Sequence, residues 1–195
     1  MKNKLQSIVM DWIPRESKVV DFGCGDGSLL KMLANKKSIT GYGVENDPNK
    51  INECIINGVS VIQQDIDYGI NNYRDMGFDF AIMASSIQCL RRPKDVIINI
   101  LQVANECVIT LPNFGNWELR MGLLKGKMPS SAKLPAKWYE TKNLHLCTIS
   151  DFEELCSVES FNIKKKVYLN NSGSSSWLSN SFPNLFAAEA VYLIG

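Results

Sequence analysis

The residues that first suggest chemistry form a glycine-rich turn early in the chain. The segment Asp21–Gly27 reads Asp-Phe-Gly-Cys-Gly-Asp-Gly and follows a short apolar run. Glycine lets a backbone turn sharply and lets a ligand touch the main chain, so Gly23, Gly25 and Gly27 suit a binding loop. In a doubly wound sheet, nucleotides bind at the first turn from strand to helix. The turn therefore predicts a nucleotide-like ligand.

The acid at the start of this turn narrows the choice of ligand. A dinucleotide fingerprint has a third glycine three residues after the second, and this chain has Ser28 there. Asp21 stands two residues before the first glycine. A carboxylate at that point repels a diphosphate and attracts the ammonium group of a methionine-like moiety. The pattern thus favours S-adenosylmethionine (SAM) or S-adenosylhomocysteine (SAH) over NAD.

Two further acids stand where such a ligand needs them. Glu45 ends the second predicted strand, where a carboxylate can accept both ribose hydroxyls, although a surface acid is the alternative. Asp65 follows the third predicted strand and either accepts the adenine amino group or caps a helix. Their neighbours Asn46 and Ile66 belong to the same predicted cofactor site. Cys24 is included through its place in the turn, and a packing role for its thiol is the alternative.

The end of the fourth predicted strand faces the reactive end of this ligand, because ligands lie outside the carboxyl ends of parallel strands. Ser85, which we include in the cofactor site, lies there with Ser86 and Gln88. These side chains either line the reactive end or cap a helix, and the sequence does not separate the two. His145 is a candidate for a general base. We favour a buried histidine that ties the neighbouring segment to the sheet.

Strand and helix patterns alternate through the first half of the chain. Strands are predicted at Lys18–Phe22, Tyr42–Glu45, Val59–Gln63, Phe78–Ala84 and Glu106–Leu111. Helices are predicted at Ser28–Asn35 and at Pro93–Ala104. A further helix is predicted to begin at Asp47-Pro48 and to end at Asn57-Gly58, and its buried face is predicted to carry Ile51, Cys54 and Ile55. This alternation predicts an α/β, Rossmann-like fold with a mostly parallel sheet and helices on both faces.

A segment at about 113–146 interrupts the alternation, because glycines and prolines recur and only Trp117–Leu124 has a short helical pattern. Its lysines and aromatic residues suit a docking surface or an anionic ligand, and equally a solvated lid over the pocket. After this insertion we predict a helix at Ser150–Cys156. Strands at Asn162–Leu169 and Ala187–Ile194 then pair as a hairpin across a serine-rich loop, Asn170–Ser181.

Composition limits the classes of protein that fit. A chain of 195 residues fits one domain, residues 1–195, and its net charge of +1 gives no sign of a nucleic-acid partner. No apolar run is long enough for a signal peptide or a membrane span, so we expect a cytoplasmic protein. Six cysteines without a Cys-x-x-Cys pair and a single histidine predict free, mostly buried thiols and no metal site.

The turn at Asp21–Gly27, together with Glu45 and Asp65, resembles the class I SAM-dependent methyltransferases. Further segments make the chain similar to the MetW family of methionine biosynthesis proteins, from about Lys18 to Leu169. These segments are Gly41–Glu45, Gly58–Gln63, Leu90–Pro93, Leu111–Trp117 and Asn143–Thr148.

The resemblance implies a seven-stranded methyltransferase sheet with an antiparallel last strand. It also implies a role beside homoserine O-acyltransferase, MetX. Two functions follow from it. One is a SAM- or SAH-binding protein that activates MetX or senses a ligand for it. The other is an active methyltransferase on an unidentified small molecule.

Overall fold

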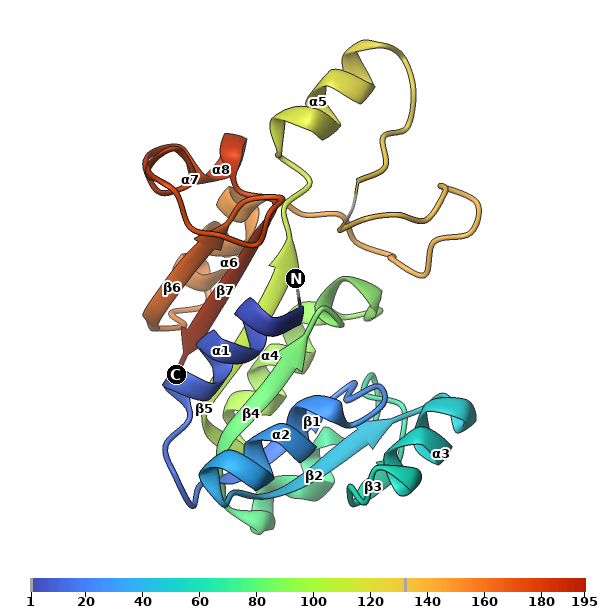
Figure 1. Cartoon of the computed structure of the whole chain (residues 1–195), viewed down its shortest axis with the longest axis vertical. Helices are drawn as coiled ribbons and strands as arrows, with labels where there is room; N and C mark the ends of the chain where they lie inside the picture. Colours follow the sequence, from blue (N-terminus) through green and yellow to red (C-terminus); the bar gives the residue numbers. More distant parts are fainter. Residues whose placement is uncertain (1, 132) are drawn as a thin grey trace.

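One seven-stranded sheet forms the centre of the computed structural model, which describes residues 2–131 and 133–195 (Figure 1). Residues 1 and 132 of the predicted domain lie outside the described part. The strands are β1 (Lys18–Phe22), β2 (Thr40–Glu45), β3 (Val61–Gln63), β4 (Phe78–Ala84), β5 (Ala104–Pro112), β6 (Ile163–Leu169) and β7 (Glu189–Ile194). The strand order is β3-β2-β1-β4-β5-β7-β6.

The pairing directions confirm the predicted Rossmann-like methyltransferase sheet. The pairs β1·β2, β1·β4, β2·β3 and β4·β5 are parallel. β7 is antiparallel to both of its neighbours, β5 and β6, and it forms with β6 the hairpin predicted from the sequence. The order changes direction beside β1, because β1 lies between β2 and β4. This switch point is where an open parallel sheet binds its ligand.

Helices cover both faces of the sheet. They are α1 (Lys2–Trp12), α2 (Ser28–Lys37), α3 (Pro48–Ile56), α4 (Pro93–Leu101), α5 (Trp117–Leu124), α6 (Ile149–Val158), α7 (Trp177–Ser181) and α8 (Pro183–Phe186). Two 3-10 helices are η1 (Ile70–Met76) and η2 (Ile87–Cys89). Asp47 caps α3 as expected, because its side chain accepts a hydrogen bond from the Asn49 N–H, and Pro48 starts the helix.

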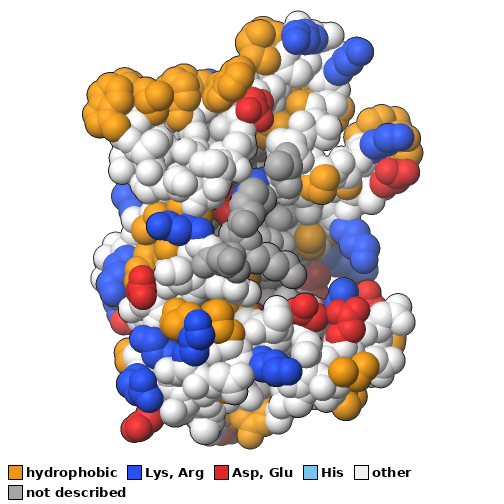
Figure 2. All heavy atoms as spheres, viewed as in Figure 1, with side chains coloured by type: hydrophobic (Ala, Val, Ile, Leu, Met, Phe, Trp, Pro, Cys, Tyr) orange, Lys and Arg blue, Asp and Glu red, His pale blue; other side chains and the backbone are white. Residues whose placement is uncertain are grey.

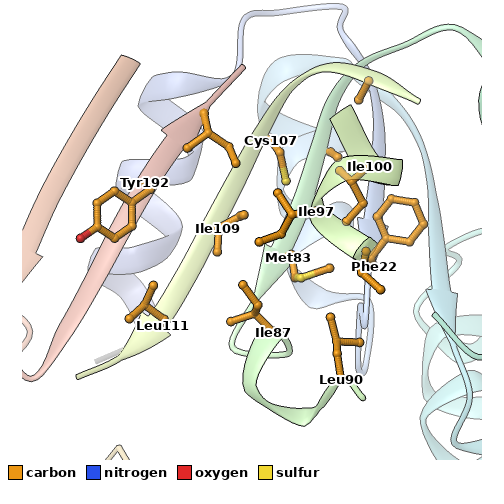
Figure 3. Close-up of a cluster of buried hydrophobic side chains, with 14 of the residues drawn as sticks. Phe22, Met83, Ile87, Leu90, Ile97, Ile100, Cys107, Ile109, Leu111 and Tyr192 are labelled. Atoms are coloured by element: carbon orange, nitrogen blue, oxygen red, sulfur yellow. The ribbon is translucent and has the colours of Figure 1, made fainter. Parts of the chain in front are cut away.

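Two buried clusters hold these layers together. Successive side chains of a strand point to opposite faces, so Val19 and Val20 of β1 belong to different clusters. One cluster joins α1, α2 and α3 to the sheet, and the other joins η1, α4 and α6 to it. Figure 3 shows the second cluster, with Ile97 and Ile100 of α4 packed against strand residues such as Phe22.

Several sequence predictions differ from the structure. Helix α1 was not predicted. The predicted loop Asn170–Ser181 contains α7, which a capping box between Ser176 and Ser179 stabilises, and α8 follows it. Helix α4 ends at Leu101, because β5 already begins at Ala104. Ile55, predicted on the buried face of α3, has 62% of its surface exposed, while Cys54 is buried. Among the described helices, none has the length and apolarity needed to cross a membrane.

Candidate cofactor site

The glycine turn joins β1 to α2 and is fastened to the neighbouring strand. The backbone N–H groups of Gly23 and Cys24 both donate to the carbonyl oxygen of Val44 in β2, at 2.8 and 3.2 Å. Gly25 has a left-handed backbone with a φ of +58°, and a Cβ added to it would meet nothing within 4 Å. The main chain at Gly25 therefore borders open space, as a ligand-binding turn requires.

Asp21 lies beneath this turn and is almost completely buried, with 2% of its surface exposed. Burial, with a smaller contribution from the charge of Glu45, raises the pKa of its carboxyl to about 7. Its Oδ1 atom has no hydrogen-bond partner among the described residues. Native proteins rarely leave a buried polar atom unpaired, so this oxygen has the character of a ligand-binding group.

Glu45 ends β2, and its carboxylate folds over the glycine turn. Its Oε2 accepts a hydrogen bond from the Gly25 N–H at 2.9 Å. Its Oε1 accepts from the N–H groups of Asn46 and Asp47, at 2.8 and 3.1 Å. These three donors fix the carboxylate at the edge of the turn. The Asn46 side chain is exposed beside it.

The Cys24 side chain turns away from the ligand side of the loop and packs against the sheet. Its sulfur lies 3.7 Å from the Cys54 sulfur and directly over the Cα of Gly43, where any Cβ would overlap it. Burial raises the pKa of this thiol well above its ordinary value. The Cys24 thiol therefore has the packing role, and Cys24 contributes only its main chain to the ligand side of the turn.

Asp65 and Ile66 follow β3, the neighbour of β2 in the sheet. The Asp65 carboxylate accepts from the Asp67 N–H at 3.0 Å, and no helix begins there, so the helix-cap alternative is wrong. Ile66 packs against the main core cluster, and its Cδ1 lies 3.6 Å from the position a Cβ on Gly23 would take. The structure therefore brings Ile66 next to the glycine turn.

The segment after β4 meets the turn from the neighbouring strand. Ser86 contacts the Cα of Gly23, and its hydroxyl donates to the Phe22 carbonyl oxygen at 3.2 Å instead of capping η2. Ser85 has a left-handed backbone with a φ of +58°, which is uncommon for a residue other than glycine. Its N–H donates to the Thr110 hydroxyl at 2.9 Å. Thr110 was not singled out from the sequence, where it is one residue of an apolar run.

A cavity of about 340 Å³ opens beside Ser85 and Gln88, between the end of β4 and the insertion. Gln88 is buried, and its Oε1 has no partner within the described part of the chain. Residues of the insertion that complete the lining include Phe114, Met128, Leu134 and Trp138. The volume falls in the range of small-molecule pockets.

His145 corrects the prediction of a buried histidine. It is exposed, yet it does tie the insertion to the sheet, because its backbone N–H donates to the Gln88 carbonyl oxygen at 3.0 Å. Its Nε2 lies 3.3 Å from the Arg91 carbonyl oxygen. The backbone of His145 therefore holds the insertion against the segment after β4, while its imidazole ring stays exposed.

A second tie was not found from the sequence. Lys133 of the insertion forms an ion pair with Glu189 of β7, and both side chains are largely buried. The two residues are far apart in the chain, so only the folded sheet shows that they meet.

All six cysteines are free, and four of them are buried, as expected. Over the described residues, no three His, Cys, Asp or Glu side chains gather as a metal ion would need.

Comparison with known proteins places the chain in a family. The model of the methionine biosynthesis protein MetW matches residues 4–194. The chain belongs to the MetW family. It is 26% identical over 193 residues to the bifunctional methionine biosynthesis protein MetXA/MetW of Rhodopirellula baltica. The match covers 94% of this chain and 31% of that protein, so the chain spans about a third of its relative.

Solved structures with a similar fold include two methyltransferases and a cyclase. The MetW-family chain matches a complex of the Haloferax volcanii Trm112 methyltransferase activator and its putative methyltransferase, with a TM-score of 0.70, 11% identity, and 98% and 88% of the two chains covered. The small RNA methyltransferase HEN1 matches with a TM-score of 0.72 and 16% identity, and the match covers 100% of this chain and 25% of that one. The [4+2]-cyclase SpnF matches with a TM-score of 0.68 and 14% identity, and the match covers 98% of this chain and 80% of that one. At these identities the likeness shows the class I methyltransferase fold alone.

Proposed function

We propose that this MetW-family protein binds SAM or SAH at the glycine turn and acts with homoserine O-acyltransferase, MetX, as its activating or ligand-sensing partner. The observation that carries the binding proposal is the buried Asp21 carboxylate, whose Oδ1 lacks a partner. An unpaired buried carboxylate costs free energy, and the ammonium group of a methionine moiety would relieve that cost.

The rest of the site gives this ligand a consistent place. Glu45 would accept a ribose hydroxyl, because its carboxylate is already fixed beside the open space at Gly25 and its Oε2 keeps one acceptor position. Asp65 and Ile66 would flank the adenine, since Ile66 lies close to Gly23. The remaining contacts proposed for the cofactor are the main chain of Gly23, Cys24 and Gly27, with Asn46 and Ser85.

Association with MetX is supported by the fused relative. The Rhodopirellula baltica protein is named as a bifunctional methionine biosynthesis protein, MetXA/MetW. Fusion keeps two functional units at a high effective concentration, which is of use when they act on each other. We extend this association to the present chain as a proposal.

Thermal unfolding with and without ligand tests the binding proposal. A ligand at 100 times its Kd adds about 2.7 kcal/mol to stability. For a chain of this size that raises the melting temperature by roughly 5–10 °C. We expect such a rise with SAM and SAH and none with NAD at the same concentration. A melting temperature that responds to neither SAM nor SAH would overturn the proposal.

Enzyme kinetics tests the partnership. The purified acyltransferase from the same genome is assayed alone, with this protein, and with this protein plus SAH. We expect its rate or its thermal stability to change on mixing, and the size of the change to depend on SAH. An acyltransferase that neither binds this protein nor changes in rate or stability would refute the partnership, whatever the result with SAM.

A working methyltransferase is the second candidate, and the cavity beside Ser85 and Gln88 favours it. A methyl acceptor there would lie at the carboxyl end of β4, next to the reactive end of the proposed cofactor. Transfer of labelled methyl groups from SAM to small molecules of a cell extract tests this. The control is the Asp21→Asn variant, which should transfer none. Absence of a labelled product with the natural protein argues against this candidate.

A further inference from the structure

Two helices beyond the end of the sheet expose large apolar side chains. Figure 1 shows α5 projecting past the end of β5, with α7 and α8 on the other side of the same edge. Figure 2 shows hydrophobic side chains gathered along this edge. We call this surface the apolar ridge, and it consists of Trp117, Met121, Leu123 and Leu124 from α5 with Trp177, Leu178 and Phe182 from α7 and the residue after it. Leu124 is 80% exposed and Trp177 is 74% exposed.

The two halves of the ridge border one open groove of about 320 Å³. Trp117 lines it from α5, and Leu178 and Phe186 line it from α7 and α8. Large contiguous apolar surfaces mark interaction sites, and tryptophan is enriched among residues that dominate binding energy. Because a small ligand would leave most of the ridge uncovered, the surface suits a protein.

A network of buried asparagines holds the groove in shape. Asn113 donates from its side-chain amide to the carbonyl oxygens of Asn184 and Ala187, at 3.1 and 2.8 Å. Asn116, which caps α5, donates to the same Ala187 oxygen at 3.0 Å. Both asparagines are buried. The start of α5 is thus bonded to the end of α8, and a partner would meet a preformed surface with little ordering to be done.

Charge around the ridge is distributed unevenly. The segment 170–186, which contains α7 and α8, has no charged residue. The α5 side has Arg120, Lys125 and Lys127 against a single acid, Glu118. Within the described part of the chain, neither Lys125 nor Lys127 forms an ion pair. The ridge is therefore apolar along its length and basic at one end.

We propose that the apolar ridge is the surface on which this protein docks the acyltransferase, through a patch of the enzyme that is apolar at its centre and acidic at one side. The inference rests on the proposed function, which supplies the identity of the partner. Complementary charge at the rim steers two proteins together and fixes their orientation, while the apolar centre holds the complex.

Charge also distinguishes this partner from a second copy of the chain. In a twofold dimer the same patch meets itself. The basic end of the ridge would then face either itself or the uncharged α7 side, with only Glu118 available as an acid. Such a contact would leave most of the basic groups without a counter-charge. A different protein with an acidic rim fits the ridge better.

Docking on the ridge would also place the enzyme next to the cavity described above. Gly122 of α5 lies against Pro129, whose Cβ would be 2.6 Å from a Cβ added at Gly122. Pro129 and Met128 line the cavity. A partner bound to α5 therefore contacts the helix that packs against Pro129 in the cavity wall, so occupancy of the site and docking can affect each other.

Binding of the purified acyltransferase to full-length variants tests the inference. Trp177→Asp and Leu124→Asp each place a charge in one half of the ridge, and we expect at least a tenfold loss of affinity for each. Ile56→Asp is the matched control, because Ile56 on α3 is 84% exposed and away from the ridge. The combined variant Lys125→Glu, Lys127→Glu should slow association at low salt and lose that effect at high salt. Circular dichroism melting confirms that each variant is folded.

The outcomes separate the inference from the proposed function. Loss of affinity in the ridge variants with normal binding by Ile56→Asp supports the inference. Normal binding by the ridge variants overturns it and leaves the partnership intact. No binding by the natural protein overturns both. Size-exclusion chromatography of the protein alone adds one more result: self-association that the ridge variants abolish would show a second copy as the occupant and overturn the assignment to the enzyme.

Discussion

The Glu45 carboxylate joins the second strand to the glycine turn, because its Oε2 accepts a hydrogen bond from the Gly25 N–H at 2.9 Å. Its other oxygen accepts from Asn46 and Asp47. The acid proposed to bind the ribose is thus also the group that fixes the shape of the turn. Each carboxylate oxygen has two lone pairs, so these three contacts fill both positions on Oε1 and leave one position on Oε2 for a hydroxyl donor.

Replacing Glu45 should therefore weaken the ligand in two ways. Glu45→Ala removes the ribose acceptor and releases Gly25, and we expect SAH affinity to fall by roughly 1–3 kcal/mol, the usual loss for a hydrogen bond to a charged group. Glu45→Gln keeps one acceptor oxygen and should lose less. Glu53→Ala is the control, because Glu53 is an exposed acid on α3 paired with Lys50. Isothermal titration calorimetry measures all three, and an unchanged Kd for Glu45→Ala contradicts the assignment.

Asp21 should make ligand binding depend on pH. The pKa of its carboxyl is raised to about 7, and the ammonium group of SAM or SAH favours the ionised form. Affinity for SAH should therefore rise between pH 6 and pH 8 and level off above that. Asp21→Asn carries no ionisable group, so its affinity should be low and nearly flat over this range. Calorimetry across the pH series tests this, and equal pH profiles for the two proteins would contradict it.

The same burial should make Asp21 destabilising in the absence of ligand. Its pKa in the folded protein, about 7, lies above the ~3.9 expected in the unfolded chain, so the folded state binds the proton more tightly. The contribution of this group to stability is full below about pH 4 and declines as pH rises through 7.

Asp21→Asn should accordingly be more stable than the natural protein at pH 8, by about 1–3 kcal/mol. The difference should shrink toward pH 5. Urea unfolding at the two pH values measures it. A variant less stable than the natural protein at pH 8 would show that Asp21 has a structural role instead of a binding one.

The sequence predicts most of the sheet, because the local signals agree with the final fold. Strand β4 is bounded as predicted, since a nearly continuous apolar run is typical of a strand covered on both faces. Helix α1 was not predicted, although Leu5, Ile8, Val9 and Trp12 recur at the spacing of one buried helix face. Helix α7 lies in a serine-rich segment that is typical of a loop, and its capping box was not recognised.

The structure brings predicted site residues together where a strand end determines a residue's place. Asp21 lies one residue before the end of β1, Glu45 ends β2 and Ser85 follows β4, so the parallel sheet alone brings them to one edge. Contacts between distant segments could not be obtained in this way. The Lys133–Glu189 ion pair depends on the path of the insertion, and the exposure of His145 depends on a main-chain bond to Gln88.

Gly43 should be intolerant of any side chain, because Cys24 fills the space where its Cβ would stand. Gly43→Ala should destabilise the protein by about 1–3 kcal/mol, the usual cost of overpacking a core. Adding Cys24→Ala removes the overlapping sulfur and should recover part of the loss. Urea unfolding of both single variants and the double variant gives the interaction energy. Strictly additive effects would show that the two residues do not share this space.

The Lys133–Glu189 pair should hold the insertion against the sheet. Lys133→Met leaves the buried Glu189 carboxylate without its counter-charge, and we expect a loss of roughly 3 kcal/mol in the free energy of unfolding. The double variant Lys133→Met, Glu189→Gln removes the uncompensated charge and should recover most of this loss. It should still release the insertion, so protease cleavage within 128–146 should be faster than in the natural protein. Lys50→Met is the control, because its partner Glu53 is exposed and the pair should contribute less than about 1 kcal/mol. If the double variant resists protease as the natural protein does, the ion pair does not hold the insertion, and other contacts, such as the main-chain bonds of Leu144 and His145 to Gln88, do so.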